Sequence, residues 1–132
     1  MGKLSLLLDT HIFLWWLFDD PALPNKIREL IRSKENQVYI SSASAWEIAT
    51  KFRIGKLPHA GTVAKNVPYW IVQAGFTTLP ITPEHAQLAG SWDHPHRDPF
   101  DRMLAAQAKL ENVPLVSVDK QLKSFPIQMI AG

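Results

Sequence analysis

The sequence predicts an α/β fold, with a mostly parallel central sheet of about five strands and helices on both of its faces. Three observations support this prediction. Short apolar runs alternate along the chain with longer segments whose apolar residues recur at helical spacing. The chain has 132 residues, enough for one domain with a buried core. Apolar residues make up 46% and charged residues 20%, as in ordinary globular proteins, so we treat residues 1–132 as one domain.

Strands and helices succeed one another along the whole chain. Five strands are expected, at residues 4–8, 38–40, 76–79, 113–118 and 127–130. Six helices are expected, at residues 10–18, 25–33, 45–54, 62–73, 82–88 and 99–110. The first strand is a leucine-rich run of the kind that is buried on both faces of a parallel sheet. Pro21 and Pro24 separate the first two helices.

Turn and capping residues set most of the later boundaries. Gly55 stops the third helix, and Gly75 ends the fourth. Pro80 ends the third strand. Asp98 is suited to cap the last helix, with Pro99 as its first residue.

The strand order is expected to be 3-2-1-4-5. Alternating strands and helices imply right-handed crossovers between parallel strands. In such sheets ligands bind beyond the carboxyl ends of the strands, near the point where the strand order reverses. Asp9 follows the first strand and Asp119 follows the fourth, so both belong at the edge where a site is expected.

Composition narrows the chemistry. The chain has no cysteine, which excludes thiol nucleophiles, disulfides and thiolate metal sites, so any metal must bind oxygen or imidazole. The formal net charge is +2, from 14 basic and 12 acidic residues. If five of the acids gather in one metal-filled cleft, the remaining surface is strongly basic and attracts a polyanion.

The apolar opening stretch, residues 4–18, raises the question of a signal peptide or a membrane span. Asp9 and His11 interrupt it, and neither remaining run approaches the ~20 residues that cross a bilayer. An Asp-Asp-Pro sequence at 19–21 follows where a signal peptide needs small residues. We therefore expect a cytoplasmic protein with no membrane contact.

Four acids are the candidates for catalysis and metal binding: Asp9, Glu47, Asp101 and Asp119. The predicted fold brings two strand-end acids and two helix-borne acids to one end of the sheet. Carboxylates that lie so close repel one another, and their pKa values rise unless a cation neutralises them. Hard oxygen ligands select Mg²⁺ or Mn²⁺. Such ions activate water and stabilise the leaving oxygen in phosphoryl chemistry.

Each acid also has a simpler interpretation. Asp9 and Asp119 could each cap a following helix. Glu47 could form an i,i+4 pair with Lys51, an interaction worth ~0.3–0.5 kcal/mol. At the start of the last helix, Asp98 is expected to act mainly as the cap, whereas Asp101, one turn inside the helix, is better placed to reach the cleft. The combination of four acids at one edge is therefore more informative than any single member.

Short motifs occur in a fixed order, at residues 7–11 (LLDTH), 44–48 (SAWEI) leading to 55–57 (GKL), 98–108 (DPFDRMLAAQA) and 115–119 (LVSVD). Together they resemble the PIN-domain ribonucleases, and within them the VapC-like toxins of toxin–antitoxin pairs, over essentially the whole chain. By this resemblance Asp9, Glu47 and Asp101 match the three metal-site acids, Asp119 matches a fourth, and Thr10 matches a supporting hydroxyl. Asp98 recurs beside the matching acid, so Asp98 and Asp101 remain alternatives for the direct metal ligand.

The resemblance implies a PIN-like fold and an endoribonuclease, a phosphodiester hydrolase that cuts single-stranded RNA. It implies Mg²⁺ or Mn²⁺ as cofactor, hydrolysis by a metal-activated water, a cognate antitoxin that blocks the cleft, and a homodimer. The alternative is a catalytically degenerate domain of the same fold that binds RNA or a partner without cleavage.

Two further groups of residues are expected at surfaces. Five basic residues could rim the cleft and hold phosphates, although each could equally be a solvated charge: Lys51, Arg53, Lys56, Arg97 and Arg102. Trp15, Trp16 and Phe18 are expected at an antitoxin or dimer contact, because neighbours on a helix do not face the same core. The other tryptophans are assigned to core packing. A zinc site at His94 and His96 lacks any further motif.

Two other functions of α/β domains are disfavoured. A receiver-type phosphoacceptor domain needs paired acids just after the first strand and a lysine after the last, and the acidic pair is missing here. A dehalogenase-like phosphatase needs two aspartates separated by one residue, and His11 occupies that second position.

Overall fold

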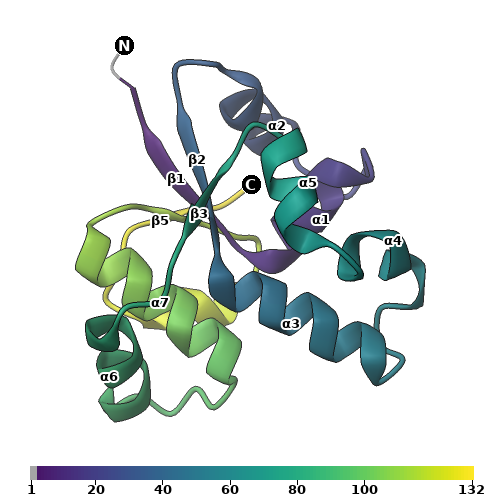
Figure 1. Cartoon of the computed structure of the whole chain (residues 1–132). Coiled ribbons are helices and arrows are strands. Elements are labelled where there is room, and N and C mark those ends of the chain that lie inside the picture. Colours follow the sequence, from purple (N-terminus) through teal and green to yellow (C-terminus); the bar gives the residue numbers. More distant parts are fainter. Residues whose placement is uncertain (1–2) are drawn as a thin grey trace.

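The computed structural model describes residues 3–132 and contains one five-stranded sheet (Figure 1). Its strands are β1 (Ser5–Leu8), β2 (Gln37–Ser41), β3 (Thr77–Leu79), β4 (Leu115–Val116) and β5 (Met129–Ile130). The strand order is β3-β2-β1-β4-β5, and every neighbouring pair is parallel. The predicted α/β class and strand order are therefore confirmed.

Helices connect the strands and cover both faces of the sheet (Figure 1). They are α1 (Thr10–Leu17), α2 (Asn25–Arg32), α3 (Ser42–Arg53), α4 (Gly61–Ala64), α5 (Val67–Gln73), α6 (Pro83–Ser91) and α7 (Pro99–Glu111). Two short 3₁₀ helices, η1 (Pro58–Ala60) and η2 (Lys120–Ser124), complete the described chain. Within residues 3–132 no helix is long and apolar enough to cross a bilayer.

The two faces of the sheet carry separate core layers. Leu6 and Leu8 of β1 pack in one layer, to which α1, α2, α3 and α5 contribute apolar side chains. Leu7 points the other way and packs with Leu104 of α7 and Leu122 of η2. Because successive strand residues alternate between faces, a strand buried on both sides must be apolar throughout, which explains the leucine run.

The helix expected over residues 62–73 is wrong as a single element. Helix α4 ends at Ala64, and α5 begins at Val67 after Asn66, whose side chain accepts a hydrogen bond from the Tyr69 amide at 3.3 Å. The physical reason is Pro68, which lacks an amide hydrogen and in a continuous helix would clash with the carbonyl one turn earlier. A new cap therefore starts a new helix.

The last two strands are shorter than expected. The fourth was predicted over 113–118 and spans only Leu115–Val116, and the fifth begins at Met129. Directly after β4, the Ser117 amide still donates a hydrogen bond to the Ile130 carbonyl of β5 at 3.1 Å. The Ser117 side chain donates a hydrogen bond to Asp9 at the end of β1, so this residue contributes directly to the site described next.

Candidate active site

A cleft of about 420 Å³ lies at the carboxyl edge of the sheet. All four candidate acids line it, together with the supporting residues Thr10 and Asp98. Lys51 and Trp15 also reach it, as do four residues that the sequence did not single out for this cleft: His11, His96, Val118 and Gln121. The expectation that the acids meet at this edge therefore agrees with their placement, although their roles stay predictions.

Asp9 is held by the elements on either side of it. Asp9 is only 7% exposed, and its carboxylate caps α1, because Oδ1 accepts a hydrogen bond from the Ile12 amide at 3.0 Å. Oδ2 accepts a second hydrogen bond, from the Ser117 hydroxyl. Burial raises the pKa of Asp9, the two hydrogen bonds oppose that rise, and the negative charge of Glu47 adds to it. Asp9 is thus both a helix cap and part of the cleft.

Glu47 projects from α3 and is 4% exposed. Its Oε1 accepts a hydrogen bond from the Thr10 hydroxyl at 2.6 Å, and its Oε2 lies 2.5 Å from Lys51 Nζ. The Thr10 hydroxyl also lies 2.9 Å from Ser44 Oγ, which fixes its direction. Pairing with Lys51 and a place in the cleft are therefore compatible rather than alternative.

The ammonium of Lys51 is the positive charge inside the cleft. Burial lowers its pKa, but the hydrogen bond from Lys51 to Glu47 and the nearby charges of Glu47, Asp98 and Asp101 together raise it above the usual value. An ammonium surrounded by three carboxylates partly neutralises them. This one ammonium therefore offsets only part of the negative charge of the cleft.

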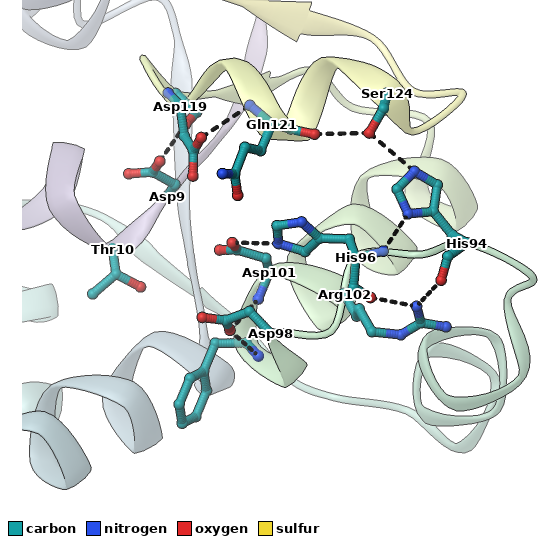
Figure 2. Close-up of polar contacts among 12 residues, drawn as sticks. Asp9, Thr10, His94, His96, Asp98, Asp101, Arg102, Asp119, Gln121 and Ser124 are labelled. Carbon is teal, nitrogen blue, oxygen red and sulfur yellow. Dashed lines mark hydrogen bonds and ion pairs between the residues drawn. The ribbon is translucent and has the colours of Figure 1, made fainter.

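The start of α7 supplies the two remaining carboxylates on that side. Asp98 caps the helix, accepting hydrogen bonds from the Phe100 amide at 2.9 Å and the Asp101 amide at 3.2 Å. Asp101 is half-buried, and its Oδ2 lies 2.8 Å from His96 Nε2 (Figure 2). Burial raises the pKa of Asp101 to about 6; the His96 hydrogen bond opposes the rise and the charge of Asp98 adds to it. The expected capping role of Asp98 agrees with these contacts.

Arg102 does not face the cleft as an RNA contact, which corrects the prediction that it helps hold phosphates. Its guanidinium donates hydrogen bonds to four backbone carbonyls, one in α6 and three in the loop between α6 and α7, at distances from 2.5 to 2.9 Å. The acceptors belong to Ala89, Trp92, His94 and His96. With its donors so engaged, Arg102 fixes the loop that carries His96.

Asp119 completes the cleft at the start of η2. Its Oδ1 accepts a hydrogen bond from the Gln121 amide at 2.9 Å, and its own amide donates to Ser117 Oγ at 3.0 Å. Ser117 therefore touches both Asp9 and Asp119, and it ties the two strand-end acids together. The sequence contained a signal for this link, the LVSVD motif, but did not show what its serine binds.

The side chains of the cleft offer carboxylate oxygens as possible ligands for a divalent metal. Among residues 3–132, no three His, Asp or Glu side chains are grouped closely enough to hold a metal ion as they stand. The chemistry of the donors nevertheless fits Mg²⁺ or Mn²⁺, because the cleft offers carboxylate oxygens, the hard ligands that such ions prefer. The raised pKa values of Asp9 and Asp101 reflect burial, and neighbouring negative charge adds to them. A bound cation would relieve that repulsion.

Other predicted surface residues are dispersed. Arg53 and Lys56 are exposed at the far end of α3 and do not line the cleft, whereas Arg97 is exposed and lines a groove beside it. Trp15 and Trp16 both pack against the same core layer, but each is only half-buried and Trp15 also lines the cleft. Their place at an antitoxin or dimer contact therefore stays a prediction.

Phe18 and Trp46 are the more exposed aromatic residues near this part of the chain. Phe18 is 40% exposed and contacts the His59 ring edge-on. Trp46, expected in the core, is 56% exposed and packs edge-on against Phe100 with ring centroids 4.7 Å apart. Trp46 precedes Glu47, so its ring points away from the buried side of α3. Helical spacing would have predicted the exposure of Trp46 once Glu47 was assigned to the cleft.

The fold and the cleft together define a class: a parallel α/β domain whose acidic residues converge beyond the carboxyl ends of β1 and β4. The family model of the PIN domain matches residues 6–127. The chain therefore belongs to the PIN domain family. This confirms the resemblance drawn from the four motifs.

A curated ribonuclease is similar to part of this chain. Ribonuclease VapC16 of Mycobacterium tuberculosis (strain ATCC 25618 / H37Rv) is 38% identical over 65 residues, which cover 49% of this chain and 45% of the relative. The match thus spans less than half the length of that curated relative.

Solved structures support the fold across the whole chain. VapBC2 from Rickettsia felis, bound to a promoter DNA fragment, matches with a TM-score of 0.70 at 16% identity and covers 97% of this chain and 98% of that one. VapBC-1 from nontypeable Haemophilus influenzae matches with a TM-score of 0.62 at 13% identity, covering 97% and 98%. FitAcB from Neisseria gonorrhoeae gives 0.62 at 16%, covering 95% and 96%.

Proposed function

We propose that this protein is a Mg²⁺- or Mn²⁺-dependent endoribonuclease that cleaves single-stranded RNA in the acidic cleft. The observation that carries the proposal is the burial of Asp9 and Glu47, 7% and 4% exposed, on one wall of a cleft that also contains Asp101 and Asp119. Lys51 pairs with Glu47, whereas Asp9 accepts hydrogen bonds only from neutral donors, and a bound cation would compensate its buried charge. Membership of the PIN domain family and similarity to a ribonuclease support the same activity.

Each acid has a proposed role. Asp9, Glu47, Asp101 and Asp119 would hold the metal, with Asp98 as the alternative ligand to Asp101. When bound, the ion supplies an activated water and stabilises negative charge on the leaving oxygen of the phosphodiester.

The surrounding residues orient these acids before the metal binds. The Thr10 hydroxyl fixes one oxygen of Glu47, the Ser117 hydroxyl fixes one oxygen of Asp9, and His96 fixes one oxygen of Asp101. Fixed ligands lose little entropy on binding, which favours a defined geometry for the reacting groups. Lys51 donates a hydrogen bond to the other oxygen of Glu47, and its positive charge offsets part of the negative charge of the nearby acids.

We propose further that the protein is the toxin of a VapBC-type pair, acting in the cytoplasm as a homodimer whose cognate antitoxin blocks the cleft. Solved structures of similar fold include VapBC and FitAB complexes, which supports a protein partner. The surface around Trp15, Trp16 and Phe18 is the proposed contact, because Trp15 borders the cleft and Phe18 is exposed. Expression of the protein alone should therefore arrest growth of a host.

A cleavage assay tests the activity directly. Purified protein is incubated with end-labelled single-stranded RNA in excess chelator, and Mg²⁺, Mn²⁺ or Ca²⁺ is then supplied. We expect no cleavage in chelator, restoration by Mg²⁺ or Mn²⁺, and poor restoration by Ca²⁺. Full cleavage in chelator would reject the metal-dependent mechanism. RNA binding without cleavage under every condition would instead support the degenerate module.

A further inference from the structure

A second, shallower groove continues from the acidic cleft across the protein surface. Its volume is about 570 Å³, and it shares His96, Asp98 and Gln121 with the cleft. Its walls come from the loop between α6 and α7 on one side and from η2 on the other (Figure 2). The cleft and the groove are therefore adjacent, with these three residues at their common border.

The loop wall of the groove is rigid. Arg102 donates hydrogen bonds to three carbonyls of the loop and to one carbonyl at the end of α6, as described above. The imidazole of His94 stacks on Phe125 with centroids 3.8 Å apart and an angle of 13° between the rings. Its Nδ1 accepts a hydrogen bond from the His96 amide at 3.0 Å, and its Nε2 lies 3.0 Å from Ser124 Oγ. The two walls are thus joined, and the exposed part of the His94 ring lines the groove.

The charge of the groove suits a polyanion. Arg97 and Lys120 line it and are exposed, and among residues 3–132 neither of them forms an ion pair. Asp98 is the acid that lines the groove, and its carboxylate already accepts two amide hydrogen bonds at the start of α7. Arginine and lysine that lack a protein partner are the side chains that most often bind phosphates.

We infer that this groove is a subsite for the RNA strand, which extends the proposed function. Arg97 and Lys120 bind the phosphodiester adjacent to the one cut in the cleft. The exposed part of the His94 ring and the Gln121 amide contact the nucleotide between the two phosphates. Single strands are bound in this way elsewhere, by a positive groove that follows the backbone and by ring faces that tolerate any base. The subsite therefore adds affinity for the strand without reading its sequence.

The test measures binding rather than cleavage. A fluorescent single-stranded RNA oligonucleotide is titrated with the full chain in Ca²⁺ at several salt concentrations. The variant is Arg97→Ala with Lys120→Ala, and the matched control is Lys34→Ala with Lys109→Ala, two exposed lysines outside the cleft and the groove. We expect the groove variant to bind about tenfold more weakly at low salt. The slope of log Kd against log salt should fall by about 0.7 for the lost phosphate contact. The control should retain the wild-type affinity and slope.

Three outcomes decide the inference. If the groove variant binds RNA with the wild-type affinity and slope while the wild-type protein cleaves RNA, the subsite is overturned and the proposed function stands. Failure of the wild-type protein either to bind or to cleave RNA would overturn both. A polyaspartate peptide serves as a competing probe: if the double substitution weakens peptide binding but leaves RNA binding unchanged, the groove docks an acidic protein segment and the RNA subsite is rejected. Thermal melting confirms that both variants are folded.

Discussion

The two sides of the acidic cleft are built in different ways. On the strand side, Asp9 directly follows β1, and Glu47 projects from α3, the helix that directly follows β2. Both acids are almost fully buried, and hydroxyls of neighbouring elements hold them. On the helix side, Asp101 is half-buried and is held by His96, which belongs to a loop. The strand side depends on the sheet, whereas the helix side depends on a loop that Arg102 fixes.

This difference separates two kinds of preorganisation. A side chain at a strand end is positioned by the most stable part of the molecule, and its orientation survives small disturbances elsewhere. A side chain held by a loop keeps its orientation only while the contacts that fix the loop persist. Substitutions on the strand side should therefore change mainly the cleavage rate. Substitutions of residues that hold the loop should change both the free energy of unfolding and the cleavage rate.

The largest expected effect is that of Asp9→Asn on the strand side. Asparagine keeps an oxygen that accepts the Ile12 hydrogen bond and caps α1, but it removes the charge that would hold the metal. We expect RNA cleavage to fall by orders of magnitude, since each ~1.4 kcal/mol of lost transition-state stabilisation is tenfold. Thermal melting in chelator should change little, because a buried charge is removed. A clearly lower melting temperature would show that Asp9 is chiefly structural.

Arg102 gives the next effect, on the helix side. Arg102→Gln leaves several carbonyls of the loop without their donor, and we expect a loss of about 2–4 kcal/mol in the free energy of unfolding. Arg102→Lys should recover little of this, because one ammonium does not reproduce the geometry of a guanidinium. The control is Lys109→Gln, an exposed cation on the same helix. Equal denaturation midpoints for Arg102→Gln and the control would mean that the loop does not depend on Arg102.

A smaller effect concerns pH and Asp101. Its pKa is raised from 3.8 to about 6 in the folded protein, so the folded state binds this proton more tightly than the unfolded state. The metal-free protein should therefore lose stability as pH rises from about 4 to about 6, by at most about 3 kcal/mol and by less because solvent screens the partly exposed side chain.

Asp101→Asn isolates that effect because asparagine does not titrate. Above pH 6 the variant should be more stable in chelator than the wild type, and below about pH 4 the two should coincide. Denaturant titrations across this pH range provide the measurement. A stability difference that is independent of pH would assign the change to packing and not to the charge of Asp101.

The sequence predicted the strand side of the cleft better than the helix side. The leucine run of β1 and the acid directly after it follow from local rules, because a buried strand must be apolar and its end is where a ligand site forms. The break at Pro68 also follows a local rule that the helical spacing of residues 62–73 obscured.

The helix side depends on contacts between segments that are distant in the sequence, and no local pattern predicts those contacts. The Arg102 side chain reaches back to carbonyls as far as Ala89, and the His94 ring stacks on Phe125 across 31 positions of chain. A basic residue beside an acidic motif looks the same in sequence whether it faces RNA or a loop. The structure distinguishes these two arginines. The Arg102 guanidinium donates hydrogen bonds to four backbone carbonyls, whereas Arg97 is exposed and lines the groove.

The most direct test of the account is the cleavage rate of Glu47→Gln in Mn²⁺, compared with the wild type and with Glu35→Gln, an exposed acid outside the cleft. Glutamine keeps the shape of Glu47 and still accepts the Thr10 hydrogen bond, but it carries no charge. If Glu47 is a metal-site acid, the rate should fall at least about 100-fold, equivalent to about 2.7 kcal/mol, while Glu35→Gln keeps the wild-type rate. Full cleavage by Glu47→Gln would contradict the account, because Glu47 would then serve only as the partner of Lys51.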